Sequence, residues 1–192
     1  MVTINASTTA GLVMTSDLSG TLSLQSNGVA VTMPAVAGTM MVSGNMPAFD
    51  VYANNAQGIT SSTATKVQLA NKVIDTNNCF DSTTNYRFTP TVAGYYLITA
   101  SFSLAAANYF TIGTALVYKN GSPYRNLGGN FAGGTGAMNY SMGSLTFVVQ
   151  MNGTTDYLEL YGYCNGTSPI VVYNTSAQAG TTFMSGCLLR TS

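Results

Sequence analysis

The chain has 192 residues, and its six acidic and six basic side chains give a formal net charge of zero. Charged residues make up 6% of it, against about 25% in a typical soluble domain, and it contains no histidine. The balanced charge argues against nucleic-acid binding and a polybasic membrane patch, and the missing histidine excludes the usual serine and cysteine triads. Because so charge-poor a surface is seldom left bare by a monomer, we expect obligate assembly.

The first 45 residues read differently from the remainder. Thr21–Leu24 and Val29–Thr32 flank an Asn27-Gly28 turn and predict a hairpin, followed by a short strand over Met40–Val42. An isolated hairpin is only marginally stable in water, so it must dock on other copies or on a neighbouring protein. The initial residues lack the basic start and apolar stretch of a secretory signal, which indicates synthesis in the cytoplasm. We therefore expect residues 1–45 to be an attachment or shaft segment and residues 46–192 to be the main domain.

Strict alternation of apolar and polar residues marks the main domain as a set of strands. It is clearest over residues 95–104 and recurs over residues 112–119, 144–151 and 157–161, with a short apolar run over residues 169–173. Asn-Gly pairs stand beside strand-like segments at Asn120, Asn152 and Asn165, and this dipeptide tolerates the positive φ of tight hairpins. No segment has a convincing helical period. The sequence thus predicts an all-β antiparallel sandwich or jelly roll.

A series of short motifs resembles one known family. The phrase from Asn85 to Ile98 contains Arg-Phe-Thr-Pro-Thr and Ala-Gly-Tyr-Tyr, and three later motifs follow in order over residues 118–121, 152–158 and 183–189. Two earlier segments, residues 47–49 and 71–75, stand where that family has its first strands. Together, over about residues 46–190, they resemble the C1q-like (C1q/TNF-type) jelly roll, and more narrowly the form found in bacteriophage tail-fibre and other virion proteins.

This resemblance implies a homotrimer and a place in a virion. It is similar to tail-fibre domains that bind a host-surface glycan or outer-membrane component, with the N-terminal segment attached to other virion proteins. The protein would then be assembled in the host cytoplasm and located in a tail or capsid appendage. The alternative is an architectural capsid decoration or baseplate protein without a receptor of its own. Neither function requires a cofactor or a metal.

Candidate ligand-binding residues are aromatic and amide side chains at strand ends and in loops. Gly128–Gly143 is rich in glycine and predicts an irregular loop between two strands, where binding usually concentrates. Rigid aromatic rings with small polar neighbours resemble antibody paratopes and can stack on sugar rings. For any single ring, filling the core or a subunit interface is the commoner role. The candidates are Tyr109, Phe131, Asn139, Tyr140, Tyr163 and Asn165.

Catalytic, calcium-binding and phosphate-binding roles have less support from the sequence. Asp75 and Asp81 flank a loop and could converge as a glycosidase pair, although turn-forming aspartates are far commoner. A calcium ion held mainly by backbone and asparagine oxygens is allowed, but no calcium-loop motif is present. The glycine-rich segment lacks the Gly-Lys-Ser/Thr of a phosphate loop. Three cysteines, at positions 79, 164 and 187, cannot all pair within one chain and are expected to be reduced and mostly buried.

Overall fold

The computed structural model describes residues 22–26, 29–33, 46–131, 138–166, 169–171 and 180–192. Every regular element in this described part is a strand, as the alternation and the turns predict. The early strands are β1 (Leu22–Ser26), β2 (Val29–Met33), β3 (Ala48–Tyr52), β4 (Gln57–Gly58), β5 (Thr65–Lys66), β6 (Asn71–Asp75), β7 (Phe80–Asp81) and β8 (Arg87–Phe88). The later strands are β9 (Gly94–Lys119), β10 (Ser122–Phe131), β11 (Met138–Met151), β12 (Leu158–Gly166), β13 (Pro169–Val171) and β14 (Phe183–Thr191).

Backbone contacts divide the chain into two compact units, Met1–Met40 and Met41–Ser192. In the first unit, β1 and β2 pair antiparallel with Ser26 opposite Val29, so the predicted hairpin is present. The predicted Asn27-Gly28 turn and the predicted strand over Met40–Val42 lie outside the described residues.

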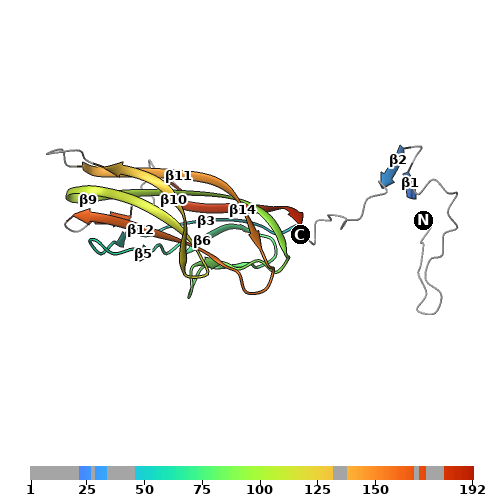
Figure 1. Ribbon diagram of the computed structural model, residues 1–192, viewed down its shortest axis with the longest axis horizontal. Coiled ribbons are helices and arrows are strands. Elements are labelled where there is room, and N and C mark those ends of the chain that lie inside the picture. Colours follow the sequence, from blue (N-terminus) through green and yellow to red (C-terminus); the bar gives the residue numbers. More distant parts are fainter. Residues whose placement is uncertain (1–21, 27–28, 34–45, 132–137, 167–168, 172–179) are drawn as a thin grey trace. The chain divides into compact units, whose positions relative to one another are not determined.

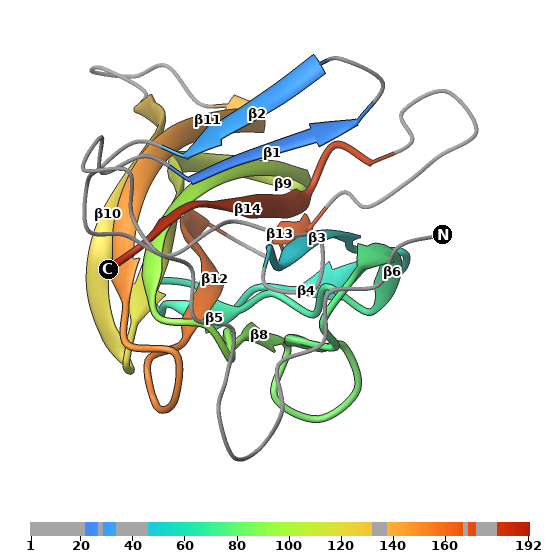
Figure 2. The same cartoon turned by 90° about the vertical axis from the view of Figure 1, so that its right-hand side faces the viewer.

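The second unit is a sandwich of two antiparallel layers (Figures 1 and 2). One layer, here the first layer, has the strand order β6-β3-β14-β9-β11. The other, the second layer, has the order β7-β8-β12-β9-β10, with β5 also on β12. Non-consecutive neighbours such as β3 and β14 are typical of a jelly roll rather than a simple meander.

Strand β9 belongs to both layers. Its first part, Gly94–Ser101, pairs with β14, and its last part, Phe110–Lys119, pairs with β12. Between them, Leu104–Ala106 pairs with β13, so the bend keeps backbone partners and the strand is not interrupted. For this reason the two strands predicted over residues 95–104 and 112–119 are one strand in the structure. In Figure 1, β9 runs to one end of the sandwich and turns back.

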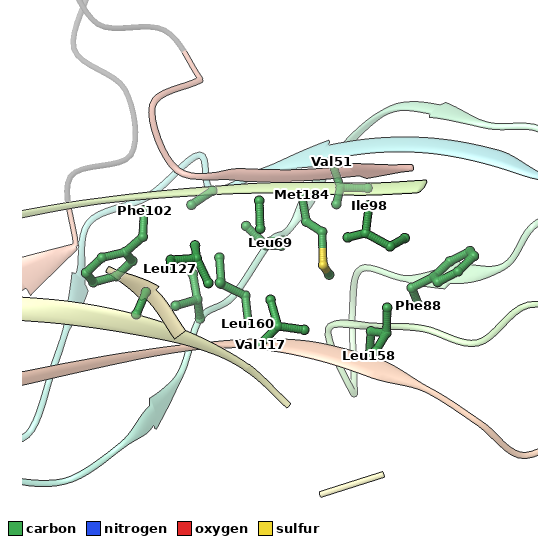
Figure 3. Close-up of a cluster of buried hydrophobic side chains, with 14 of the residues drawn as sticks. Val51, Leu69, Phe88, Ile98, Phe102, Val117, Leu127, Leu158, Leu160 and Met184 are labelled. Carbon is green, nitrogen blue, oxygen red and sulfur yellow. The ribbon is translucent and has the colours of Figure 1, made fainter. Parts of the chain in front are cut away.

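The inner side chains of the two layers form one hydrophobic core (Figure 3). The predicted inward set of β9, at positions 96, 98, 100, 102 and 104, is at most 1% exposed. Leu158 and Leu160 of β12 face it from the second layer and are also fully buried. Phe49 of β3 stacks on Phe88 of β8 with ring centroids 4.1 Å apart, so aromatic contact joins the layers.

Hydrogen bonds join two of the family-like motifs, residues 118–121 and 152–158, at one end of the sandwich. Asn120 and Gly121 both have positive φ and form the tight turn between β9 and β10, as predicted. The side chain of Asn120 donates to Asp156 at 2.7 Å and accepts from the N–H of Tyr157 at 2.9 Å. Asn152 in turn accepts three N–H groups of its own loop, including that of Asp156. These motifs therefore have a structural reason: they hold two adjacent loops in one conformation.

The prediction of an irregular loop over Gly128–Gly143 is wrong at both ends of that segment. Its described parts extend β10 to Phe131 and begin β11 at Met138, while residues 132–137 lie outside the description. The long β9 supplies backbone partners for both extensions. Gly143 serves close approach of two strands here, because a Cβ on it would lie 2.6 Å from the carbonyl oxygen of Gly128, while Gly128 itself has a positive φ. Asn165-Gly166 also lies within a strand, β12, rather than in a turn.

Candidate functional site

The backbone positions of all six candidate residues lie at one end of the sandwich, which we call the far end. It is the end at which β9 turns back, near Phe110. Tyr109 is in that bend, Phe131 ends β10, Asn139 and Tyr140 begin β11, and Tyr163 and Asn165 are near the end of β12.

The strand register shows how these segments meet at the far end. Ile112 of β9 pairs with Phe131 on one side and with Asn165 on the other, so these two candidates share a row across the second layer. Phe110 likewise pairs with Met138 at the start of β11 and with Gly166 at the end of β12. The sequence could not supply this register, because it identified the strands without their order.

Side-chain environment is described for two of the six candidates. Asn165 is exposed, and Tyr163 is half-buried on the outer side of β12. The neighbouring inward residue of that strand, Cys164, is fully buried, which confirms the alternation. The side chains of Tyr109, Phe131, Asn139 and Tyr140 lie outside the described residues.

The opposite end of the sandwich, here the chain-entry end, is where Met46 leads into β3. Leu188 donates its N–H to the carbonyl of Pro47, and the Ser192 N–H reaches Ala93, so β14 also finishes there. The C-terminus is marked at this end in Figure 1. The segment that precedes Met46 therefore joins the domain at the end away from the six candidates.

The outer side of the first layer, here the first outward face, carries an unusual number of exposed apolar side chains. Within the described residues, all seven large hydrophobic side chains that are exposed belong to strands of this layer or directly precede β3. They are Met46, Val73, Ile74, Tyr95, Met142, Val148 and Leu189, with exposed fractions from 36% to 60%. Concentration in the strands of one layer, rather than scatter over the surface, is typical of an association surface.

A shallow hollow of about 420 Å³ lies on this first outward face. Its lining includes Ile74 of β6, Leu97 of β9, and Phe183 and Cys187 of β14. Asp50 of β3 is the one carboxylate among its lining residues, and no described residue gives it a hydrogen bond or an ion pair. Sequence reasoning predicted assembly from low charge but missed which face would carry it.

The outer side of the second layer, here the second outward face, is tyrosine-rich and charged. Tyr118 and Tyr161 stack with ring centroids 4.0 Å apart. Glu159, which is buried, pairs with Lys66, and the Arg87 guanidinium lies 4.5 Å from the centre of the Tyr157 ring. Burial, followed by the neighbouring Glu159 charge, raises the pKa of Tyr161 to about 12. Polar groups here find partners within the chain.

All six cationic side chains of the protein contact a partner within the chain, either a carboxylate or a tyrosine ring. The three lysines form ion pairs, Lys66 with Glu159, Lys72 with Asp75 and Lys119 with Asp156. The three arginines, at positions 87, 125 and 190, each lie over a tyrosine ring. Surface charge is therefore used for local contacts, which leaves no basic track on the described surface.

The aspartates considered for catalysis act as loop caps. Asp81 accepts hydrogen bonds from the N–H groups of Thr84, Thr83 and Asn85, and these bonds hold its pKa well below the usual range. Asp75 accepts from the N–H groups of Cys79 and Phe80 and pairs with Lys72. A glycosidase acid needs a raised pKa, whereas the pKa of Asp81 is lowered, and both carboxylates are already engaged with their own loops, which argues against that chemistry.

The cysteines differ in burial, and the described residues contain neither a metal-ligand cluster nor a membrane-spanning helix. Cys79 and Cys164 are buried and free, as predicted, whereas Cys187 is exposed on the first outward face. Burial raises the pKa of the Cys164 thiol to about 11. Within the described ranges there is no group of three or more potential metal-ligating side chains, and no helix long and apolar enough to span a bilayer was found there.

Comparison with solved structures identifies the fold. Two crystal structures of murine APRIL, at pH 8.0 and pH 8.5, align with TM-scores of 0.52 and 0.50 at 12% and 13% identity. Each alignment covers 75% of this chain and 99% of the APRIL chain. The likeness shows an all-β jelly roll of the TNF/C1q type, which confirms the predicted fold. No protein-family model and no curated protein sequence matches the chain.

Proposed function

We propose that this protein is a bacteriophage virion component, a trimeric tail fibre or similar appendage that binds a glycan on the host surface. Support for the phage context comes from the order of the sequence motifs over residues 85–98, 118–121, 152–158 and 183–189. The TNF/C1q-type fold is consistent with a binding protein rather than an enzyme.

One observation carries the proposal. The six candidate residues gather at the far end of the sandwich, while the chain that would attach it to the particle enters at the opposite end. An adhesin needs this polarity, because its receptor site must point away from the particle. Exposed Asn165 and half-buried Tyr163 supply an amide and an aromatic ring, which suit hydroxyl groups and sugar faces.

Trimer formation is the second part of the proposal. Three-fold association would bury the apolar first outward face, which a monomer would expose to water. Three copies of a weak site on one fibre would then bind with avidity, without any further contact in each site. Residues 1–45 would connect the trimer to other virion proteins.

Labelling of host cells tests the receptor function. The purified full chain, carrying a fluorophore, should label host cells and block phage adsorption. Tyr163→Ala and Asn165→Ala should each reduce labelling several-fold, whereas Thr154→Ala, an exposed change at the chain-entry end, should not. Unlabelled host cells together with altered capsid stability would instead establish the architectural alternative.

A further inference from the structure

A second candidate site lies at the chain-entry end, on the edge of the second layer formed by β7 and β8. A pocket of about 490 Å³ opens there, within the usual range of small-molecule sites. Its lining residues are Lys72, Asn85, Arg87, Thr89 and the run from Asn78 to Thr83. Arg87 stands opposite Glu159 in the backbone register of β8 and β12. Asn165 lies roughly 20 Å further along β12, at about 3.3 Å per residue. The pocket is therefore separate from the far-end site.

The wall of this pocket is held rigidly. Both carboxylate oxygens of Asp81 accept hydrogen bonds from the turn over residues 83–85, including one of 2.7 Å from the Asn85 amide. Asp75 fixes the preceding loop through the N–H groups of Cys79 and Phe80. Tyr86 has a positive φ, which is uncommon for a bulky residue and is stabilised only where the surrounding loop is well determined. A ligand would find a preformed site, and this lowers the entropy cost of binding.

Several polar groups of the lining have no partner in the described part of the chain. The Ser82 and Thr89 hydroxyls and the Asn78 amide nitrogen make no hydrogen bond there. The Arg87 guanidinium has its ring contact with Tyr157 but no hydrogen bond or ion pair with another described residue. The lining therefore offers free donors and hydroxyl acceptors on one concave surface. A ligand rich in hydroxyl groups matches that mixture of donors and acceptors.

The charges around the pocket are balanced, which argues against a charged ligand. Lys72 is paired with Asp75, and Asp81 stands opposite Arg87 in the register of β7 and β8. The apolar side chains of the lining, Cys79 and Phe80, are themselves buried, so they offer little surface to a hydrophobic molecule. Hydrogen bonds donated by the charged Arg87 guanidinium can still orient a neutral ligand strongly.

We propose that this pocket binds a neutral saccharide unit, with Arg87 as the principal donor and with Ser82, Thr89 and Asn78 completing the contacts. This inference is independent of the proposed function, because it uses a different end of the domain and a different set of residues. It assigns the protein a second carbohydrate site beside the chain entry.

Saturation-transfer NMR on the full chain tests the pocket, with lactose and N-acetylglucosamine as neutral probes and glucuronate as the charged comparison. At least one neutral probe should bind more tightly than glucuronate. Hydrogen exchange should slow within residues 72–89 when that probe is bound. Arg87→Gln should weaken binding at least tenfold, and Ser82→Ala should weaken it several-fold.

Arg125→Gln is the matched control, because Arg125 also lies over a tyrosine ring, that of Tyr124, but is absent from the pocket lining. It should bind the probe as the unchanged protein does. The proposal is overturned if neither neutral probe binds, if protection appears only outside residues 72–89, or if Arg87→Gln and Arg125→Gln weaken binding equally. Tighter binding of glucuronate would overturn the neutral assignment. Host-cell labelling is unaffected by any of these results, so the two proposals fail separately.

Discussion

The two outward faces of the sandwich differ in how their side chains are satisfied. On the second face, Glu159, Lys66 and Tyr161 bind one another, and the tyrosine rings stack. On the first face, aliphatic side chains such as Val148 and Ile74 are about half exposed, and Asp50 has no partner among the described residues. A face whose polar groups are paired within the chain can remain in contact with water. A face with exposed apolar side chains is typical of a surface that associates with a partner. The scarcity of charged side chains thus has a different consequence on each face: internal pairing on the second face and apolar exposure on the first.

The largest expected effect comes from placing a charge on the first outward face. If the proposed trimer forms through this face, Val148→Lys should convert it to monomers at micromolar concentration, because each interface would bury an unpaired ammonium at a cost of several kcal/mol. Light scattering coupled to gel filtration measures the mass. Ser122→Lys, at an exposed position on β10 of the second layer, should leave the mass unchanged. Equal dissociation of both variants would remove the distinction between the faces.

Removing one carboxylate from each face sharpens the comparison. Glu159→Gln should lower the free energy of unfolding by about 2 kcal/mol, because the buried pair with Lys66 is lost. Asp50→Asn breaks no hydrogen bond or ion pair of the carboxylate with a described residue and should change this free energy by about 0.5 kcal/mol or less. Urea unfolding at one fixed protomer concentration gives both values. A large loss from Asp50→Asn would mean that this carboxylate is already paired within its own copy.

Acid stability should depend on Asp81, at the edge of the second layer. Its pKa in the folded protein is lowered from an ordinary value of 3.8 by hydrogen bonds from Thr84 and Thr83. The carboxylate therefore contributes stability above pH 3.8, and this contribution is lost as the pH falls from there toward the lowered folded pKa. Asp81→Asn should flatten the stability curve below about pH 4. Thermal melting between pH 2 and pH 6 measures this, and an unchanged slope would contradict it.

The smallest effect concerns the ionisation of Tyr161. Its pKa of about 12 results first from burial and then from Glu159. Absorbance titration of tyrosinate should lose one high-pH transition in Tyr161→Phe, and Glu159→Gln should move that transition to lower pH. If Glu159→Gln leaves it in place, burial alone sets the pKa and the carboxylate is not part of the local network.

Much of the fold could be predicted from the sequence because its signals are local. Alternation identified the core set of β9, and Asn120-Gly121 identified a hairpin turn. The bend that makes β9 one strand could not be predicted, because it depends on pairing with β13 some 60 residues later in the chain. Gly128–Gly143 misled for a similar reason, since Gly143 serves close packing against the backbone of β10 rather than an irregular loop.

The functional surfaces were less predictable. The six candidate residues were chosen by type, and only the strand register brings their backbones to one end. The pocket beside Arg87 left no signal beyond a run of turn residues, because its shape comes from hydrogen bonds of Asp75 and Asp81 to the loop backbone. The apolar face was hidden within ordinary alternation, where outward Val148 and Leu97 look like any other strand residue.

The central position of β14 in the first layer has a consequence for biosynthesis. This strand lies between β3 and β9, yet it follows β3 by about 130 residues. At roughly 5–20 residues per second, a ribosome needs on the order of 10 s to make that interval. During this time β3, and β9 once it has been made, each present an edge without its β14 partner in a crowded cell. The nascent polypeptide should therefore be a client of chaperones until β14 has been made.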